Sequence, residues 1–151
     1  MIRIIAIGKK HETWIAEGIQ RYQKRLKKPF DIEWVFLPHS ALSGTTASDK
    51  ESSAILSRIN ANDYVVLLDE RGENANSIDI SRKITTQLEQ SKPVTLIIGG
   101  AYGVNSALSD RSDFIWSLSK LVFPHQLVRL ILTEQLYRTQ EISLGNPYHH
   151  E

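Results

Sequence analysis

The chain has 151 residues, 41% of them hydrophobic, and a formal net charge of +1. This length corresponds to about one domain and the hydrophobic content is sufficient for a core, so we expect a single domain over residues 1–151. The absence of cysteine excludes a disulfide framework, a thiolate metal site and a cysteine nucleophile. The apolar start has neither a preceding basic segment nor a following cleavage site, so we expect no signal peptide, no membrane association and a cytoplasmic location.

Strand-like and helix-like segments alternate along the chain. Short runs of apolar and β-branched residues predict strands, and apolar residues at helical spacing predict helices. In chain order, the predicted strands are residues 2–7, 32–37, 64–68, 94–98 and 113–117, and the predicted helices are 13–28, 48–59, 78–89 and 125–142, with a flexible loop at 40–47. This order predicts an α/β fold with a mostly parallel sheet flanked by helices.

Three segments that follow predicted strands are candidates for a binding site. Ligands of parallel α/β sheets bind beyond the carboxyl ends of the strands, where this chain has residues 68–72, the glycine-rich 99–103 and 118–125. Glycine allows the backbone to approach a ligand closely. The glycine spacing matches neither the dinucleotide-binding nor the P-loop pattern, so both classical phosphate sites are disfavoured.

The last predicted helix is apolar around most of its circumference. Its apolar residues are Leu127, Val128, Leu130, Ile131, Leu132 and Leu136. Such a helix must be covered on nearly all sides, and the simplest covers are the sheet and a second subunit. A homodimer would also hold the C-terminal tail, residues 145–151, against a neighbouring pocket.

The charge is unevenly distributed along the chain. Residues 1–28 hold eight Lys or Arg and two Glu, a balance of 8 − 2 = +6, so the remainder carries −5. This pattern is compatible with a solvated helix surface and with a face that contacts phosphates.

The segments LIIGGAYG, SLSKLVFPHQLVRLILTEQLYR and NPYHHE resemble the SPOUT-class methyltransferases, specifically the rRNA large subunit methyltransferase H family. The resemblance runs the full length of the chain. It implies a deep C-terminal trefoil knot, a homodimer, and S-adenosyl-L-methionine bound in a bent form. It also implies methylation of N3 of a pseudouridine in the intersubunit stem-loop, helix 69, of 23S rRNA within the assembled 70S ribosome, without a metal ion.

The resemblance assigns a cofactor role to the segments that follow the strands. The implied cofactor-binding residues are Leu68, Gly99, Leu118, Ser119, Lys120, Leu121, Val122 and Phe123. Taken singly, Leu68 and Phe123 are equally compatible with core positions. His125 is interpreted either as a structural histidine that bonds a loop carbonyl or as a catalytic residue.

The resemblance also implies catalytic residues in the tail. His149 is the candidate base, or the residue that orients it, because N3 must lose a proton and histidine titrates near working pH. Tyr148 is expected to stack on the target base or hydrogen-bond it. His150 is the third candidate catalytic residue, although it stands where many relatives carry arginine and is a weaker, pH-dependent cation. Tyr102 stands where many relatives carry an acidic or amide residue, so a polar contact from it to the cofactor is not assumed.

The positions of the charged residues suggest roles in RNA binding and in helix or interface stability. The expected RNA-binding residues are Lys24, Arg25, Lys27, Lys28 and Arg138. Arg129, Glu134 and Arg138 lie along the final helix and are otherwise interpreted as interface or helix-stabilising charges, with Glu134 and Arg138 at a favourable i,i+4 spacing.

Two alternative functions differ in class. A metal-dependent hydrolase would use His125, His149 and His150 with Asp69 or Glu151, but adjacent histidines in an extended segment point to opposite sides and no H-E-x-x-H spacing occurs. The second alternative is a non-catalytic ribosome- or RNA-binding protein that retains a cofactor pocket.

Overall fold

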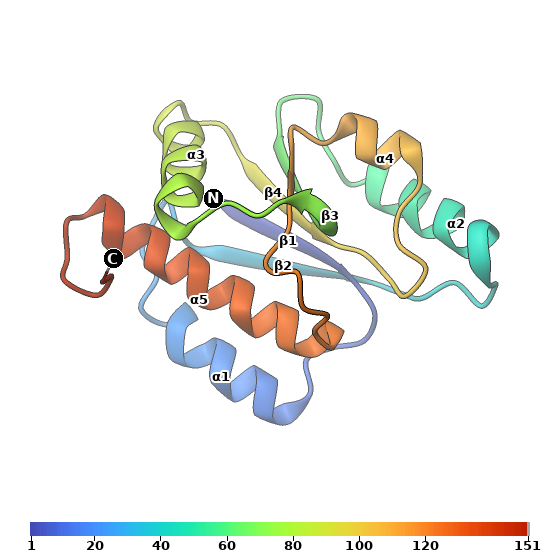
Figure 1. The fold of residues 1–151 in the computed structure, drawn as a ribbon, viewed down its shortest axis with the longest axis horizontal. Helices are drawn as coiled ribbons and strands as arrows, with labels where there is room; N and C mark the ends of the chain where they lie inside the picture. The colour runs from blue at the N-terminus through green and yellow to red at the C-terminus, as the bar shows by residue number, and fades with distance from the viewer. Residues whose placement is uncertain (151) are drawn as a thin grey trace.

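Five strands form one sheet in the computed structural model, which describes residues 1–150 (Figure 1). The strands are β1 (Ile2–Ile7), β2 (Ile32–Leu37), β3 (Tyr64–Glu73), β4 (Val94–Ile98) and β5 (Phe114–Trp116). Their order across the sheet is β2-β1-β4-β3-β5, and every neighbouring pair is parallel. The predicted α/β fold with a mostly parallel sheet is therefore confirmed.

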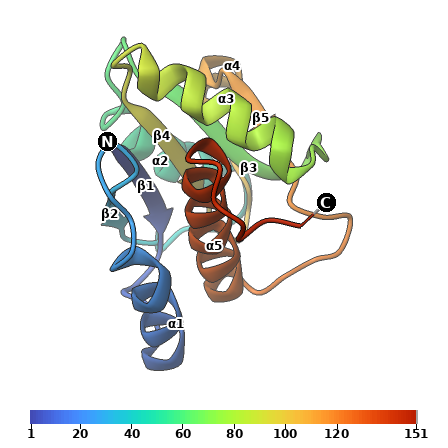
Figure 2. The same cartoon turned by 90° about the vertical axis from the view of Figure 1, so that its left-hand side faces the viewer.

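Helices cover both faces of this sheet (Figures 1 and 2). They are α1 (Thr13–Gln23), α2 (Gly44–Leu56), α3 (Ser77–Glu89), α4 (Ser106–Arg111) and α5 (His125–Ser143). Neighbouring residues of β1 point to opposite faces: Ile4 joins the buried cluster that includes Leu132 of α5, and Ile5 joins the cluster that includes Ile55 of α2. Because both faces are buried, the central strands β1 and β4 are largely apolar, and Arg3 and Thr95 are their polar residues.

The predicted bounds of two helices are wrong, for different physical reasons. Helix α1 ends at Gln23, not at residue 28, because the side chain of Gln140 hydrogen-bonds the backbone of the next segment, at Lys27 N (2.7 Å) and Arg25 O (3.1 Å). Helix α2 begins at Gly44, inside the predicted loop, and ends at Leu56. Its first turns bury small residues, Ala47 and Ser48, which give no hydrophobic periodicity to detect.

The β3–β5 region also differs from the prediction. Strand β3 continues to Glu73, where it pairs again with Trp116 after an irregular stretch from Leu68. Gly72 makes this possible, because a Cβ there would lie 2.5 Å from the carbonyl oxygen of Ile115. The sequence pattern did not predict α4, whose first turn is capped by Asn105 accepting from Leu108 N.

Helix α5 begins near the carboxyl ends of the strands and runs between α1 and α3 toward the side where the C-terminus lies (Figures 1 and 2). The two ends of α5 therefore lie in different parts of the molecule. The trefoil knot and the homodimer stay predictions at this stage.

Candidate active site

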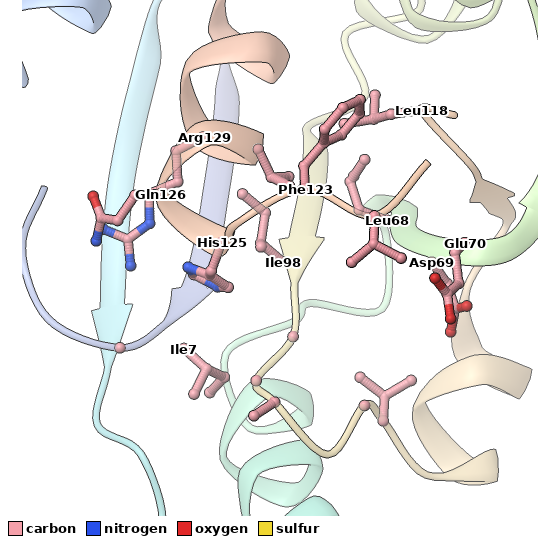
Figure 3. A pocket seen from close by; sticks show the side chains of 18 of the residues that line it. Ile7, Leu68, Asp69, Glu70, Ile98, Leu118, Phe123, His125, Gln126 and Arg129 are labelled. Atoms are coloured by element: carbon pink, nitrogen blue, oxygen red, sulfur yellow. The ribbon is translucent and has the colours of Figure 1, made fainter. Parts of the chain in front are cut away.

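A pocket of about 860 Å³ opens at the carboxyl edge of the sheet (Figure 3). Parts of all three segments selected from the sequence line it, namely residues 68–71, 99–103 and most of 118–125. Residues that follow β1, including Gly8 and Lys9, complete the lining. The sequence rule that ligands bind beyond the strand ends thus led to this cavity.

Seven of the eight predicted cofactor-binding residues line this pocket. They are Leu68, Gly99, Leu118, Ser119, Leu121, Val122 and Phe123. Lys120 is exposed and is not part of the lining. Leu121 and Val122 are 70% and 82% exposed and form the outer rim, whereas Leu68 and Phe123 are partly buried. The pocket thus has an apolar inner wall and an exposed apolar rim.

The glycine-rich loop rests on a buried carboxylate that sequence reasoning missed. Glu51 of α2 is 5% exposed, and its Oε2 accepts a hydrogen bond from Ser40 N (2.9 Å). Its Oε1 lies 2.5 Å from where a Cβ of Gly100 would be. Gly100 is therefore required by close approach, as the sequence suggested for this loop in general.

Two side chains of α5, one turn apart, give the pocket a polar side. His125 Nε2 is buried without a hydrogen-bond partner among the described residues. Burial lowers the pKa of His125, and the nearby Arg129 guanidinium lowers it further, so its ring is neutral near pH 7. Arg129 is 1% exposed and its Nη1 donates to Lys9 O (2.8 Å). Its position in the pocket lining was not predicted.

The tail folds back onto the last turns of α5. Tyr148 donates its hydroxyl to Glu134 Oε1 (3.1 Å), and Arg138 bonds both Glu134 Oε1 (2.5 Å) and His149 Nδ1 (2.9 Å). Burial and the Glu134 carboxylate raise the pKa of Tyr148 to about 12. Tyr148 is therefore a protonated donor near neutral pH. His150 is exposed.

The contact with Arg138 fixes the role of each nitrogen of His149. A guanidinium has only donors, so Nδ1 must accept, and a neutral imidazole then carries its hydrogen on Nε2. In this arrangement the free nitrogen of His149 is a hydrogen-bond donor.

The tail cluster of Glu134, Arg138, Tyr148 and His149 lies apart from the pocket of the same chain. Between His125 and Arg138 the helix rises about 20 Å, at about 1.5 Å per residue. The histidines required for a metal-dependent hydrolase are therefore not brought together. Within residues 1–150, no group of three or more His, Asp or Glu side chains is placed to hold a metal ion.

The predicted RNA-binding residues lie on the tail side of the molecule. Lys24, Arg25, Lys27 and Lys28 are exposed in the connection from α1 to β2, which Gln140 of α5 holds. Aromatic contacts link this region to the tail: the ring centroids of Tyr22 and Tyr137 are 5.8 Å apart, and those of Tyr137 and Tyr148 are 4.9 Å apart. The basic segment and the tail cluster thus occupy one end of the molecule.

Residues 1–149 match the family model described as "Predicted SPOUT methyltransferase". A relative from Methylobacillus flagellatus, named ribosomal RNA large subunit methyltransferase H, is 36% identical over 99% of each chain. The chain belongs to this family of SPOUT methyltransferases. Family members of the same name from Dictyoglomus thermophilum and Desulfitobacterium hafniense are 39% and 38% identical, over 99% and 98% of each chain.

The fold agrees with this family assignment. The crystal structure of a methylase family protein from Neisseria gonorrhoeae superposes with a TM-score of 0.55 at 12% identity, over 99% of this chain and 85% of the other. The SPOUT fold and the resemblance seen in the sequence are thus confirmed. Among the described residues, no helix has both the length and the apolar character needed to cross a membrane.

Proposed function

We propose that the chain is an S-adenosyl-L-methionine-dependent methyltransferase that acts on N3 of a pseudouridine in helix 69 of 23S rRNA, within the assembled 70S ribosome. The observation that carries this proposal is the pocket. This chain belongs to the SPOUT methyltransferases, and seven of its eight residues expected to bind the cofactor line that pocket. The relatives named as ribosomal RNA large subunit methyltransferases support the substrate class.

The pocket suits such a cofactor in size and chemistry. A volume of about 860 Å³ lies within the usual range for small-molecule sites, which are mostly apolar with a few polar groups. Leu68 and Phe123 provide apolar wall, and His125 Nε2 and Arg129 Nε provide buried polar atoms without partners. In this proposal the loops that line the pocket belong to the C-terminal trefoil knot implied by the family.

We infer that the working form is a homodimer in which the tail of one chain acts at the pocket of the other. Within one chain, the tail cluster is about 20 Å along α5 from the pocket. A second copy would therefore be needed to bring His149 to the methyl-transfer site. The basic segment beside the tail would then lie close to the bound RNA.

The tail residues would act on the target base. S-adenosyl-L-methionine supplies a methyl group that its sulfonium already activates. The chain must align the base and favour loss of the proton on N3. His149, whose Nε2 is a donor when Arg138 holds Nδ1, would donate to a carbonyl oxygen of the base and stabilise its deprotonated form, and the N3 proton would pass to solvent water. Tyr148 would stack on the target base or donate a hydrogen bond to it. With a pKa of about 12, it cannot serve as a proton acceptor near neutral pH.

The first test is methyl transfer from labelled S-adenosyl-L-methionine to ribosomes, separated subunits and free rRNA from cells that lack the enzyme. We expect label only in assembled ribosomes, at a pseudouridine. Cofactor binding without transfer to any of these samples would instead support the non-catalytic ribosome-binding function.

A second test asks whether the tail acts on the partner's pocket. His149→Ala removes the catalytic function of the tail, and Leu68→Trp fills the pocket. Control measurements verify that Leu68→Trp has lost cofactor binding and is still folded. If the tail acts in the partner, a heterodimer of the two variants contains one intact site and recovers about half of the wild-type activity. If each tail serves its own chain, the heterodimer is as inactive as the two parent homodimers.

A further inference from the structure

Arg129 is a buried cation with no ion-pair partner among the described residues, although the more distant Glu12 carboxylate favours its charged form. Its side chain is 1% exposed, and none of the ion pairs among residues 1–150 includes it. Its Nη1 donates to Lys9 O (2.8 Å) and lies 3.3 Å from His11 Nδ1, and its guanidinium lies 5.1 Å from the ring centroid of Phe36. Its Nε is buried and has no hydrogen-bond partner. One backbone carbonyl and an aromatic face therefore hold a full positive charge.

Such an arrangement is costly unless something compensates the charge. A buried ion loses its hydration, and buried charges in proteins are ordinarily paired or fully hydrogen-bonded. Burial lowers the pKa of Arg129, but a guanidinium stays protonated at neutral pH. The geometry thus calls for an anion beside Arg129 when the site is in use.

Arg129 faces the pocket from one end of it. Figure 3 shows Arg129 beside Gln126 at that end, His125 nearer the middle, and Asp69 and Glu70 at the opposite end. Gly8 keeps the approach open, since a Cβ there would lie 3.3 Å from Arg129 Nη2. At the opposite end Asp69 is paired with Arg71 (2.8 Å), which leaves Glu70 as the carboxylate outside that ion pair. The pocket is therefore polarised along its length.

We propose that Arg129 binds the carboxylate at the amino-acid end of S-adenosyl-L-methionine, an assignment that rests on the function proposed above. A guanidinium matches a carboxylate in planar, two-pronged hydrogen bonding. An RNA phosphate has similar chemistry, but Arg129 is 1% exposed and lines the pocket, so the end of a small ligand in the pocket could meet it after a side-chain adjustment, and a polynucleotide backbone could not. His125 Nε2, one turn away, provides a second free nitrogen at the same side of the pocket.

The ligand itself provides the sharpest test, because it requires no mutation. Binding of S-adenosyl-L-methionine and of its decarboxylated analogue to the wild-type protein is measured by calorimetry. We expect the intact cofactor to bind about 10- to 100-fold more tightly, which corresponds to one charge-assisted contact. Arg129→Met should remove this preference and Arg129→Lys should retain part of it. Lys9→Met, which removes the other cation at this end of the pocket, should keep it.

The outcomes separate this inference from the proposed function. Equal binding of the two compounds by the wild type would overturn the inference and leave the methyltransferase proposal standing. Failure to bind either compound would count against the proposed function itself. If Lys9→Met alone removes the preference, or if Arg129→Met weakens only ribosome binding, the carboxylate does not lie at Arg129 and the inference is wrong. If Arg129→Met fails to fold, as judged by thermal unfolding, the wild-type comparison and Arg129→Lys decide together, and full retention of the preference by Arg129→Lys with its loss in Lys9→Met would overturn the inference.

Discussion

His11 should make the stability of the protein depend on pH. Its ring packs edge-on against Trp34 and Phe36, with centroid distances of 4.5 and 5.1 Å, and its Nδ1 lies 3.3 Å from Arg129 Nη1. Burial, with a further contribution from Arg129, lowers the pKa of His11 from 6.5 to about 4. In the folded state His11 is therefore neutral down to about pH 4, whereas in the unfolded chain it becomes protonated below about pH 6.5.

The sign and size of the effect follow from this difference. Between those pH values the unfolded chain binds more protons, so the free energy of unfolding is fully retained above about pH 6.5 and falls as the pH decreases toward 4. For a fully buried group, the loss between about pH 7.5 and pH 5 would be at most about 2 kcal/mol. Because the ring is partly exposed and solvent screens it, we expect about 1 kcal/mol.

Urea unfolding of the wild type and of His11→Gln at the two pH values measures this contribution. The variant should lose about 1 kcal/mol less stability than the wild type on acidification. His150→Gln, which replaces an exposed histidine of the tail, serves as the control and should behave like the wild type. Equal pH dependence of the wild type and His11→Gln would refute the reasoning.

Three further predictions address the fold, the substrate and the chemistry. Gly72→Ala should lower the free energy of unfolding by about 1–3 kcal/mol in urea titrations, because its methyl group would meet the backbone of Ile115. Gly44→Ala lies in open space at φ +59°, so it should lower the free energy of unfolding by only about 1 kcal/mol. His149→Ala should abolish methyl transfer while leaving the cofactor affinity measured by calorimetry nearly unchanged, and an equal loss of both would show that the tail shapes the pocket. Charge reversal of the basic segment should weaken ribosome binding most strongly at low salt in co-sedimentation assays; the segment consists of Lys24, Arg25, Lys27 and Lys28. Unchanged binding would show that these residues are only solvated surface.

The strands could be predicted because burial leaves a local signal. A strand covered on both faces is largely apolar, so β1 and β4 were predicted with their observed bounds, and so was the edge strand β2 from its apolar run. Helix ends were less predictable because distant side chains set them. Gln140, more than 110 residues away in sequence, takes the backbone groups that follow α1, and no pattern within residues 13–28 encodes this contact.

The pocket was predictable for a similar reason, since its loops follow strands directly. Arg129 was not recognised as a part of it, nor Glu51 as a buried neighbour of its glycine-rich loop, because a single charged residue in a helix gives no sign that it is buried. The i,i+4 pair of Glu134 and Arg138 was recognised, but its contacts with Tyr148 and His149 depend on the chain reversal after α5. Gly145, at φ +71°, provides the left-handed residue at that reversal.

Helix α5 connects the two halves of the proposed site, and its remaining surface suggests how they meet. Leu127, Ile131 and Arg138 are partly exposed and recur at spacings of four and seven residues, so they lie on one face of the helix between the pocket and the tail. A two-fold axis makes the same patch of each subunit meet its own copy. Two α5 helices that cross through this face in opposite directions would bring each tail toward the other chain's pocket. The apolar character around α5, which first suggested a second subunit, would then also explain how the proposed catalytic residues after α5 reach a pocket.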